Sequence, residues 1–308
     1  MIYDSNCQPS LDNQEPLPNK KNSYPYVCQF SDMTHYINQS IPYHWHSALE
    51  LDYVAEGQLL VHTSDSVLTL NKGDAVFINS GIIHCFQAKT DDTKIFAHIF
   101  DSSFLSGIPG SLIDQKFLIP VTGNTVLKTY KIHPDSYNKI KMLEKIIEII
   151  ELNKQEPSGY ELKTRALLSL FWCMFLDEVS HLSIPAGTLK ENIDMDRIKL
   201  MIRYIETHYM EKITLETIAD AASISSRECT RCFQRTLGIS PMKFLTEHRV
   251  NIAAQKLIRT NDSVLLIGED CGFSSGSYFS KVFYEIMKYQ CHLVRFTRAF
   301  SLLAKMLL

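Results

Sequence analysis

One sequence pattern occurs twice in the last third of the chain. It first spans residues 215–233 and returns about fifty residues later, at 264–283. Each copy has apolar residues at helical spacing, then a short turn, then a second helical segment that ends on Phe233 or Phe283. This order is typical of a helix-turn-helix motif, and its repetition argues against coincidence. The sequence therefore predicts an all-α region with helix-turn-helix motifs at 213–237 and 263–287.

The second helix of each motif is the segment expected to enter a DNA groove, so its polar face carries the candidate contacts. The fork of an arginine matches guanine O6 and N7, which makes Arg227 and Arg231 the expected base readers and Arg235, near the helix end, a phosphate contact. The second copy has no such arginine, so we expect it to discriminate sequences less. The alternative is that these charges only solvate the helix face. The residues predicted to bind DNA are Arg227, Glu228, Thr230, Arg231, Arg235, Ser277, Ser280 and Lys281.

Composition and charge agree with a soluble protein that has one basic region. Of the 308 residues 45% are hydrophobic and 21% charged, and no apolar run reaches the length of a membrane span. The polar start of the chain lacks a signal core, and the eight scattered cysteines suit a reducing compartment, so we expect a cytoplasmic protein. From Asp194 onward there are 16 Lys and Arg against 12 Asp and Glu, although the whole chain carries a net charge of −3. Such an asymmetry fits phosphate contact by one domain.

The first part of the chain has a different periodicity. Short strands are expected between residues 24 and 121, at a spacing typical of a sandwich or barrel, and two amphipathic helices follow at 137–153 and 160–179. These helices either pack within the chain or form part of a dimer interface. The fold class predicted is multidomain α+β, with a β-barrel or jelly roll, then helices, then the all-α domain. The predicted segments are a flexible tail (1–22), a sensor domain (23–133), a helical segment for dimerisation or packing (134–182), a linker (183–193) and a DNA-binding domain (194–308).

Residues 194–295 resemble the DNA-binding domain of the AraC family (AraC/XylS) of transcription regulators over its full length. The resemblance rests on the first motif, on Gly238-Ile239-Ser240-Pro241 after it, and on Gly272-Phe273 followed by Tyr278-Phe279-Ser280-Lys281-Val282-Phe283. The chain departs from the family after Phe283, where the usual Gly and Pro are replaced around Lys288 and Cys291. Either an altered C-terminal helix packs on the domain, or the second motif is impaired. Cys229-x-x-Cys232 stands where the family has apolar core residues, so we do not expect zinc there.

A second resemblance lies in the β-rich part. His44-x-His46-x-x-x-Glu50 with Gly57, and Gly73 with His84, are similar to the two motifs of the cupin superfamily, although Asn79 replaces the usual proline. Three interpretations stay open: a site for Fe, Mn, Ni or Zn made by three histidines and one carboxylate, an organic-ligand pocket, and structural polar residues. The candidate metal ligands are His44, His46, Glu50 and His84. The candidate effector contacts are His44, His46, Glu50, His84, Trp45 and Tyr53.

Together these resemblances imply a bacterial, sequence-specific DNA-binding transcription regulator, an activator rather than a repressor, and not an enzyme. Its partners would be double-stranded promoter DNA, RNA polymerase, a small-molecule effector such as a sugar bound in the cupin domain, and a second copy in a homodimer. No cofactor is expected beyond the divalent metal of the cupin motif. Two alternatives remain. One is a metal-dependent cupin enzyme with a DNA-binding appendage, and the other is a constitutive DNA-binding protein whose cupin serves only as a dimerisation scaffold.

Overall fold

The computed structural model describes residues 2–4, 24–64, 66–180 and 189–294, and the chain divides into two compact units, residues 1–189 and 190–308. Most of the predicted tail and linker, and the chain after residue 294, lie outside the described residues. Residues 2–4 of the predicted tail form a short strand, β1 (Ile2–Asp4). Among the described helices, none combines the length and the apolar character that crossing a bilayer requires.

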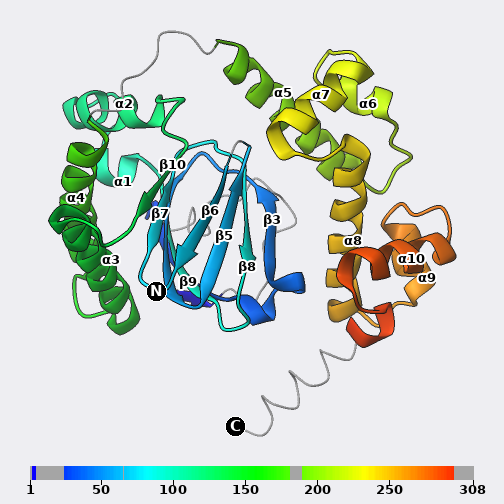
Figure 1. Ribbon diagram of the computed structural model, residues 1–308, viewed down its shortest axis with the longest axis horizontal. Helices are drawn as coiled ribbons and strands as arrows, with labels where there is room; N and C mark the ends of the chain where they lie inside the picture. Colours follow the sequence, from blue (N-terminus) through cyan, green and yellow to red (C-terminus); the bar gives the residue numbers. More distant parts are fainter. Residues whose placement is uncertain (1, 5–23, 65, 181–188, 295–308) are drawn as a thin grey trace, which may run out of the picture. The chain divides into compact units, whose positions relative to one another are not determined.

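The first unit is built around two facing β-sheets (Figure 1). The larger sheet has the order β1-β2-β9-β4-β7-β10, and the smaller has the order β3-β8-β5-β6. Strand β1 runs parallel to β2, and the other neighbouring strands pair antiparallel. The remaining strands are β2 (Tyr26–Asp32), β3 (Ser40–His44), β4 (Leu49–Glu56), β5 (Gln58–Thr63), β6 (Val67–Asn71), β7 (Ala75–Ile78), β8 (His84–Ala88), β9 (Lys94–Phe100) and β10 (Thr129–Ile132). The predicted β fold is confirmed, as two sheets rather than one closed barrel among the strands described.

Alternation along β4 explains how the larger sheet has two different faces. Leu49, Leu51 and Tyr53 pack in a hydrophobic core with the helices, whereas Glu50 and Asp52 line the space between the two sheets. Successive side chains of a strand point to opposite faces, so a single residue shift would exchange the two environments. The sequence of β4 therefore assigns an apolar face to the helices and a carboxylate face to the interior.

Helices cover the outer face of the larger sheet. The two amphipathic helices predicted from the sequence are α3 (Tyr137–Gln155) and α4 (Tyr160–Val179), and their apolar faces share one core with β4. Ser136 caps α3 by accepting a hydrogen bond from the Lys139 amide, as expected where the first helical amides lack partners. The shorter helical segments are η2 (Met33–His35), η3 (Ile37–Gln39), α1 (Ser103–Ser106), η4 (Asp114–Leu118) and α2 (Ile119–Thr122).

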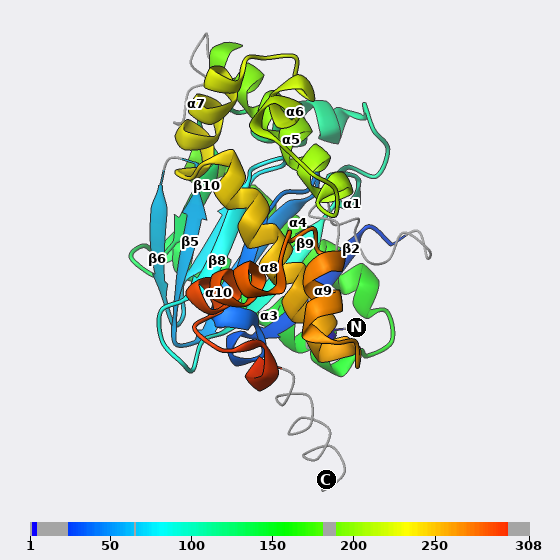
Figure 2. The ribbon, with the colours of Figure 1, turned by 90° about the vertical axis from the view of Figure 1, so that its right-hand side faces the viewer.

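The second unit is all-helical over its described residues, and it contains both helix-turn-helix motifs. The first motif consists of α6 and α7 and the second of α9 and α10, while α8 contacts all four of these helices (Figure 2). The Thr214 side chain caps the first helix of the first motif, and it forms a reciprocal capping box with Thr217. The helices are α5 (Leu189–His208), α6 (Leu215–Asp220), α7 (Ser226–Leu237), α8 (Pro241–Arg259), α9 (Val264–Asp270) and α10 (Gly276–Met287).

Arg249 on α8 ties the end of α5 to the second motif. Its guanidinium donates hydrogen bonds to the carbonyls of Tyr209 (2.8 Å) and Glu211 (2.7 Å), and it lies 6.0 Å from the centre of the Phe273 ring. Gly272, in the turn between α9 and α10, packs against the same place, because a Cβ there would lie 2.5 Å from the Tyr209 carbonyl oxygen. The turn of the second motif therefore packs directly against the residues that follow α5.

Candidate DNA-binding surface and ligand site

Helix α7 has the two faces that a recognition helix needs. Ser225 begins it by accepting a hydrogen bond from the Glu228 amide, and Gly238 ends it in the left-handed conformation at φ 68°. The apolar stripe of α7 is buried: Cys229, Cys232, Phe233 and Leu237 are each at most 5% exposed. Burying this stripe fixes the helix on the domain and leaves the opposite face in solvent.

The exposed face of α7 presents the predicted base readers. Arg227, Thr230 and Arg231 are exposed, and 55% of the Arg231 side chain is accessible. The Arg231 guanidinium is 3.9 Å from the Glu228 carboxylate, a distance too long for a hydrogen bond. Thr230 donates its hydroxyl proton to the Ser226 carbonyl one turn earlier, at 3.0 Å. Arg227 and Arg231 therefore have the exposure that insertion into a major groove requires.

Arg235, predicted as a phosphate contact, lies in an ion-pair network instead of projecting alone. Its guanidinium is 2.7 Å from the Glu228 carboxylate and 2.9 Å from that of Asp194 on α5. These two carboxylates offset the positive charge of Arg235 that would otherwise attract a phosphate. Asp194 also connects the recognition helix to α5. Arg235 remains exposed, so its phosphate contact stays a prediction, but the observed partners favour a role in positioning α7.

Helix α10 offers a weaker polar face. Ser277, Ser280 and Lys281 are exposed as predicted, and the Lys281 side chain is 73% accessible. Tyr278 and Tyr284 are about half exposed on the same helix. Glu285 occupies the position that corresponds to Arg235 of α7. With one lysine and one glutamate outward, α10 carries less positive charge toward a duplex than α7 does.

The cysteine pair of α7 belongs to the core. Cys229 and Cys232 are fully buried, and burial raises the pKa of the two thiols to about 12 and about 11. A zinc site needs thiolates, which such burial disfavours. Among the described residues, the group suited to a metal lies elsewhere, in the first unit.

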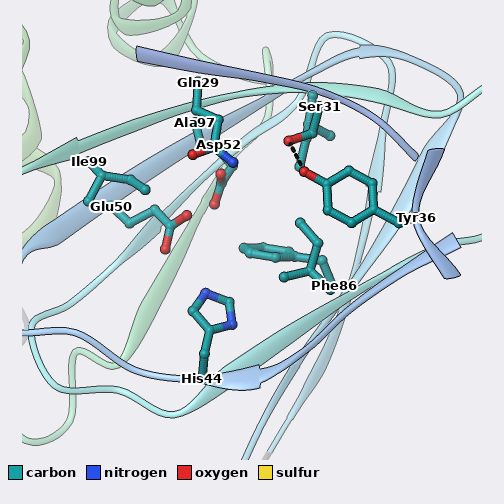
Figure 3. A pocket seen from close by; sticks show the side chains of 11 residues that line it. Gln29, Ser31, Tyr36, His44, Glu50, Asp52, Phe86, Ala97 and Ile99 are labelled. Carbon is teal, nitrogen blue, oxygen red and sulfur yellow. Dashed lines mark hydrogen bonds between the residues drawn. The ribbon is translucent and has the colours of Figure 1, made fainter. Parts of the chain in front are cut away.

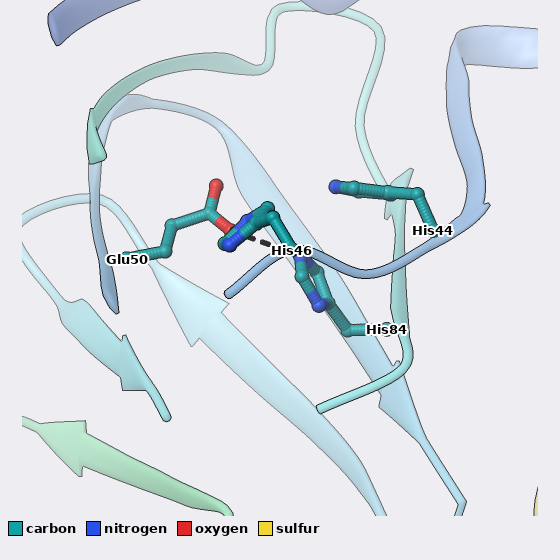
Figure 4. Close-up of side chains that lie close together, drawn as sticks. All are labelled: His44, His46, Glu50 and His84. Atoms are coloured by element: carbon teal, nitrogen blue, oxygen red, sulfur yellow. Dashed lines mark hydrogen bonds and ion pairs between the residues drawn. The ribbon is translucent and has the colours of Figure 1, made fainter. Parts of the chain in front are cut away.

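That group consists of His44, His46, Glu50 and His84, which meet between the two sheets (Figure 4). The larger sheet supplies Glu50 from β4, and the smaller supplies His44 at the end of β3 and His84 at the start of β8. The candidate ligand atoms of all four residues lie within 4.8 Å of one another. The structure therefore brings together the four residues predicted from the cupin motifs.

The hydrogen bonds of the three imidazoles determine which nitrogen faces the centre. Each Nδ1 lies 2.8–3.0 Å from a backbone carbonyl two residues away in sequence, namely those of Pro42, Ala48 and Ile82. A carbonyl oxygen can only accept, so each Nδ1 must carry the proton. A neutral imidazole then presents the lone pair of Nε2. This arrangement, in which backbone carbonyls orient the ring, is typical of histidines that bind metals.

The Nε2 atoms of His46 and His84 both lie 2.9 Å from the same Glu50 oxygen. Burial by itself would raise the pKa of Glu50, but charge attraction to the rings of His84 and His46 when Nε2 also carries a proton, and hydrogen bonds from those rings, hold it well below its usual range. Burial lowers the pKa of His44 to about 3, so that ring is neutral at pH 7. An ionised carboxylate and imidazole lone pairs are all acceptors, so the cluster needs a proton or a cation among them. Three imidazoles and one carboxylate suit Fe, Mn, Ni or Zn.

A small cavity adjoins this cluster (Figure 3). His44 and Glu50 line it, together with Asp52 and Phe86. Tyr53, predicted as an effector contact, lies on the other face of β4 and packs on the helical core, and Trp45 is buried outside the cavity lining. The cupin motifs do not include the other polar residues of the lining, which are Gln29, Ser31, Tyr36 and Asp52. Asp52 had a signal, because it lies two residues after Glu50 and must share its face.

Comparison with known proteins finds similarity in both the β-rich part and the helical C-terminal part of the chain. The family model of a helix-turn-helix domain matches residues 218–290, and that of a cupin domain matches residues 33–100. The chain is 28% identical over 265 residues to the HTH-type transcriptional regulator YdeC of Bacillus subtilis, covering 85% of this chain and 89% of that protein. It is 26% identical over 250 residues to the HTH-type transcriptional activator RhaS of Escherichia fergusonii, covering 79% and 84%.

Among solved structures, an AraC-type transcriptional regulator of Chromobacterium violaceum is 32% identical in sequence. The match covers 34% of this chain and 93% of that one, with a TM-score of 0.33.

Proposed function

The chain belongs to the AraC family of transcription regulators, with a cupin domain before its DNA-binding domain, and on that premise we propose that it activates transcription in response to a small molecule. The relative RhaS is named a transcriptional activator, which supports activation over repression, and we propose that this activation acts through RNA polymerase. The proposal places the protein in the bacterial cytoplasm, where promoter DNA and polymerase are found. Purified protein should increase transcription from its own promoter in vitro, and reduced transcription would make it a repressor.

The observation that carries the DNA-binding role is the exposed arginine face of α7 above a fully buried apolar stripe. We propose that Arg227 and Arg231 read bases in one major-groove segment. Helix α10 would lie in a neighbouring segment and contribute mainly phosphate and sugar contacts through Ser277, Ser280 and Lys281. A mobility-shift assay with genomic fragments, repeated over a series of salt concentrations, tests this. Absence of salt-sensitive binding to any fragment would contradict it.

We propose that the effector binds between the two sheets, beside the histidine cluster. Binding there would change DNA affinity only if the effector prefers one state of the protein, typically by 1–3 kcal/mol. The sequence suggested a sugar as the effector, but Trp45 and Tyr53, the aromatic residues predicted to contact it, do not line the cavity. A constitutive DNA-binding protein would show the same DNA affinity with every compound that raises its melting temperature.

We further propose that the cluster of His44, His46, Glu50 and His84 holds a divalent metal ion. The support is the orientation of the three rings, whose protonated Nδ1 atoms leave Nε2 lone pairs around Glu50. Metal analysis of the purified protein, with His84→Ala beside it, measures this. Stoichiometric metal in both proteins, or in neither, would contradict the assignment.

The relatives are named regulators, and we propose that this chain likewise has no enzymatic activity. The metal would then orient the cupin interior or an effector, and it would not support turnover. A cupin dioxygenase or isomerase would consume a small substrate when loaded with iron. Turnover of a small molecule by the metal-loaded chain, abolished in His84→Ala, would favour the enzyme alternative.

Helix α4 supports a homodimer. Four residues at helical spacing form an exposed stripe on it, here called the α4 stripe: Leu162, Ala166, Leu170 and Cys173. Leu162 and Leu170 are 73% and 54% exposed, although the rest of the helix packs in the core. We propose that a second copy covers this stripe. Leu170→Glu should give monomers in size-exclusion chromatography, whereas Lys163→Glu, exposed and beside the stripe, should not. Dimers in both variants would place the interface elsewhere.

A further inference from the structure

The repeat in the second unit continues past the two helix-turn-helix motifs. Gly238 and Lys288 lie fifty residues apart in sequence, and both end a recognition helix in the left-handed conformation. The amide of each donates a hydrogen bond to the carbonyl four residues earlier. The backbone therefore leaves α7 and α10 with the same local conformation.

The same correspondence holds for the helix that follows each motif. After the first motif this helix is α8, in which Pro241 is buried and the Phe244 amide donates to the carbonyl four residues earlier at 3.0 Å. After the second motif residues 291–294 form a helical turn, in which Cys291 is buried and the Val294 amide donates in the same way at 3.3 Å. The described part of the chain therefore stops one turn into a counterpart of α8.

Helix α8 covers the first motif with apolar side chains. It contacts both α6 and α7, and the ring of its Phe244 lies 5.8 Å from that of Phe233 in the buried stripe of α7. With α8 in place, Thr217 on α6 and Ile239 after α7 are only partly exposed. A motif of two short helices cannot bury its apolar residues alone, so a neighbouring helix completes the core.

The second motif is less covered at the corresponding positions. Leu266 on α9 corresponds to Thr217, and its side chain is 45% exposed. Tyr289 corresponds to Ile239, and it is 60% exposed. Within the described part of the chain, large apolar side chains therefore remain exposed on the second motif at positions that are partly covered on the first.

The residues after position 294 have the apolar pattern of α8. The buried residues Val250, Ile252, Ala253, Ala254 and Leu257 of α8 correspond, fifty residues later, to Phe300, Leu302, Leu303, Ala304 and Leu307. Two counterparts differ, because Arg295 and Arg298 replace Leu245 and His248. His248 packs on Tyr209 after α5, at 5.2 Å between ring centres, and this contact belongs to the first motif. The sequence pattern and the exposed surface of the second motif therefore complement each other.

We propose that residues 295–308 cover the second motif as α8 covers the first, with Phe300, Leu303 and Leu307 packed over Leu266 of α9. The second motif would then be complete, with its own covering segment where the family has its usual Gly and Pro. This packing does not involve DNA, so it goes beyond the proposed function and can hold or fail without it.

The first test is hydrogen–deuterium exchange of the full-length chain, measured by mass spectrometry. If the segment packs on the motif, the amides of residues 298–307 should exchange at least about tenfold more slowly than those of an unstructured chain. Unprotected amides would overturn the proposal. Protection that weakens when the protein is diluted would also overturn it, because a second copy would then cover the segment.

Two neighbouring leucines of α9 locate the contact. Leu266→Glu places a charge beneath the segment and should make residues 298–307 exchange about tenfold faster or more. Leu265→Glu is the matched control, because its counterpart Glu216 is exposed in the first motif although α8 is present. Both leucines are about half exposed in the described domain, so we expect both variants to fold. Equal exchange of residues 298–307 in the two variants would overturn the assignment.

A second pair of variants tests the contact from the segment itself. Leu303→Glu, at the counterpart of fully buried Ala253, should release the segment and speed exchange in α9. Thr297→Glu is its control, because the counterpart in α8 is already a glutamate, Glu247. Exchange in α6 should stay unchanged in both variants, which shows that the domain is folded. Unchanged exchange of α9 in Leu303→Glu would contradict the proposal.

Discussion

The two helix-turn-helix motifs have the same architecture but distribute their glycines differently. In the first motif the left-handed position of the turn is Ser223 (φ 53°) and the left-handed helix end is Gly238 (φ 68°). In the second motif the turn has Gly272 (φ 80°) and the helix end has Lys288 (φ 59°). Each motif therefore has one left-handed position occupied by glycine, which adopts this conformation without strain. The other left-handed position is occupied by a residue with a side chain, whose backbone is strained there. Only Gly272 is also constrained by its surroundings, because a Cβ on Gly238 would have no atom within 4 Å.

The two motifs also differ in the pair of residues where their two helices cross. In the second motif Gly268 faces Phe279, and a Cβ on Gly268 would lie 2.8 Å from that ring. The corresponding residues of the first motif are Ala219 and Cys229, a larger residue opposite a smaller one. The second motif is thus stabilised by aromatic packing, whereas the first has its arginines and its ion pairs. This contrast supports assigning base recognition mainly to the first motif.

The largest effect should come from Gly272→Ala. The new Cβ would meet the Tyr209 carbonyl at a distance that backbone cannot accommodate, in a conformation that alanine rarely adopts. We expect a loss of about 2–4 kcal/mol in the free energy of unfolding. Chemical denaturation measures it. Ser223→Gly, at the corresponding turn position, should instead leave stability within about 1 kcal/mol, and similar losses in both variants would contradict the contrast.

The next effect concerns recognition. Arg231→Ala should weaken binding to the promoter by about 1–3 kcal/mol, roughly 5- to 150-fold, and relax base preference at one position. Lys281→Ala, at the corresponding position of α10, should weaken binding to all sequences alike and reduce the salt dependence by about one counterion. Competition binding with a library of sites distinguishes the two. Equal loss of specificity in both variants would show that both motifs read bases.

A smaller effect is expected at the Arg235 network. If Arg235 positions α7 through Asp194 and Glu228, then Asp194→Asn and Arg235→Gln should reduce DNA affinity to a similar extent, and the double variant should add little. The slope of affinity against salt should stay unchanged in Asp194→Asn. A steep loss of salt dependence in Arg235→Gln alone would identify a phosphate contact instead.

The smallest effect should be a gain. Lys288→Gly relieves the left-handed conformation at the end of α10, so we expect the free energy of unfolding to rise by about 0.5–1 kcal/mol. Lys243→Gly, inside the helical part of α8, should lose a similar amount and serves as the opposite control. Denaturant midpoints measure both. A loss of stability in Lys288→Gly would mean that the lysine side chain stabilises the helix end.

Much of the fold followed from local periodicity. The helices at 137–155 and 160–179, the strands of the two sheets and both helix-turn-helix motifs match the predicted patterns, because each has an apolar face that only one periodicity can bury. The residues of the cluster, His44, His46, Glu50 and His84, were also identified from the cupin motifs, although Glu50 on β4 faces the histidines from the opposite sheet and not from the same strand face.

The partners of individual polar side chains were less predictable. Arg235 had the position of a phosphate contact, and only the packing of α5 against α7 brought Asp194 within 2.9 Å of it. Tyr53 and Asp52 are adjacent in sequence, yet the strand directs the tyrosine to the helices and the carboxylate to the cavity. A sequence motif specifies residue types at given spacings, and it does not specify which of two neighbours faces inward.

By itself the sequence determined the family and the two helix-turn-helix motifs, because these depend on spacing along single helices, and its cupin motifs identified the residues of the histidine cluster. The tertiary structure alone decided which side chains line the cavity, which carboxylates pair with Arg235 and how small the cavity is. Those properties depend on distances between segments far apart in the chain. These distances affect stability because a buried charge loses its hydration. It must then be paired with another group of the fold or with a ligand.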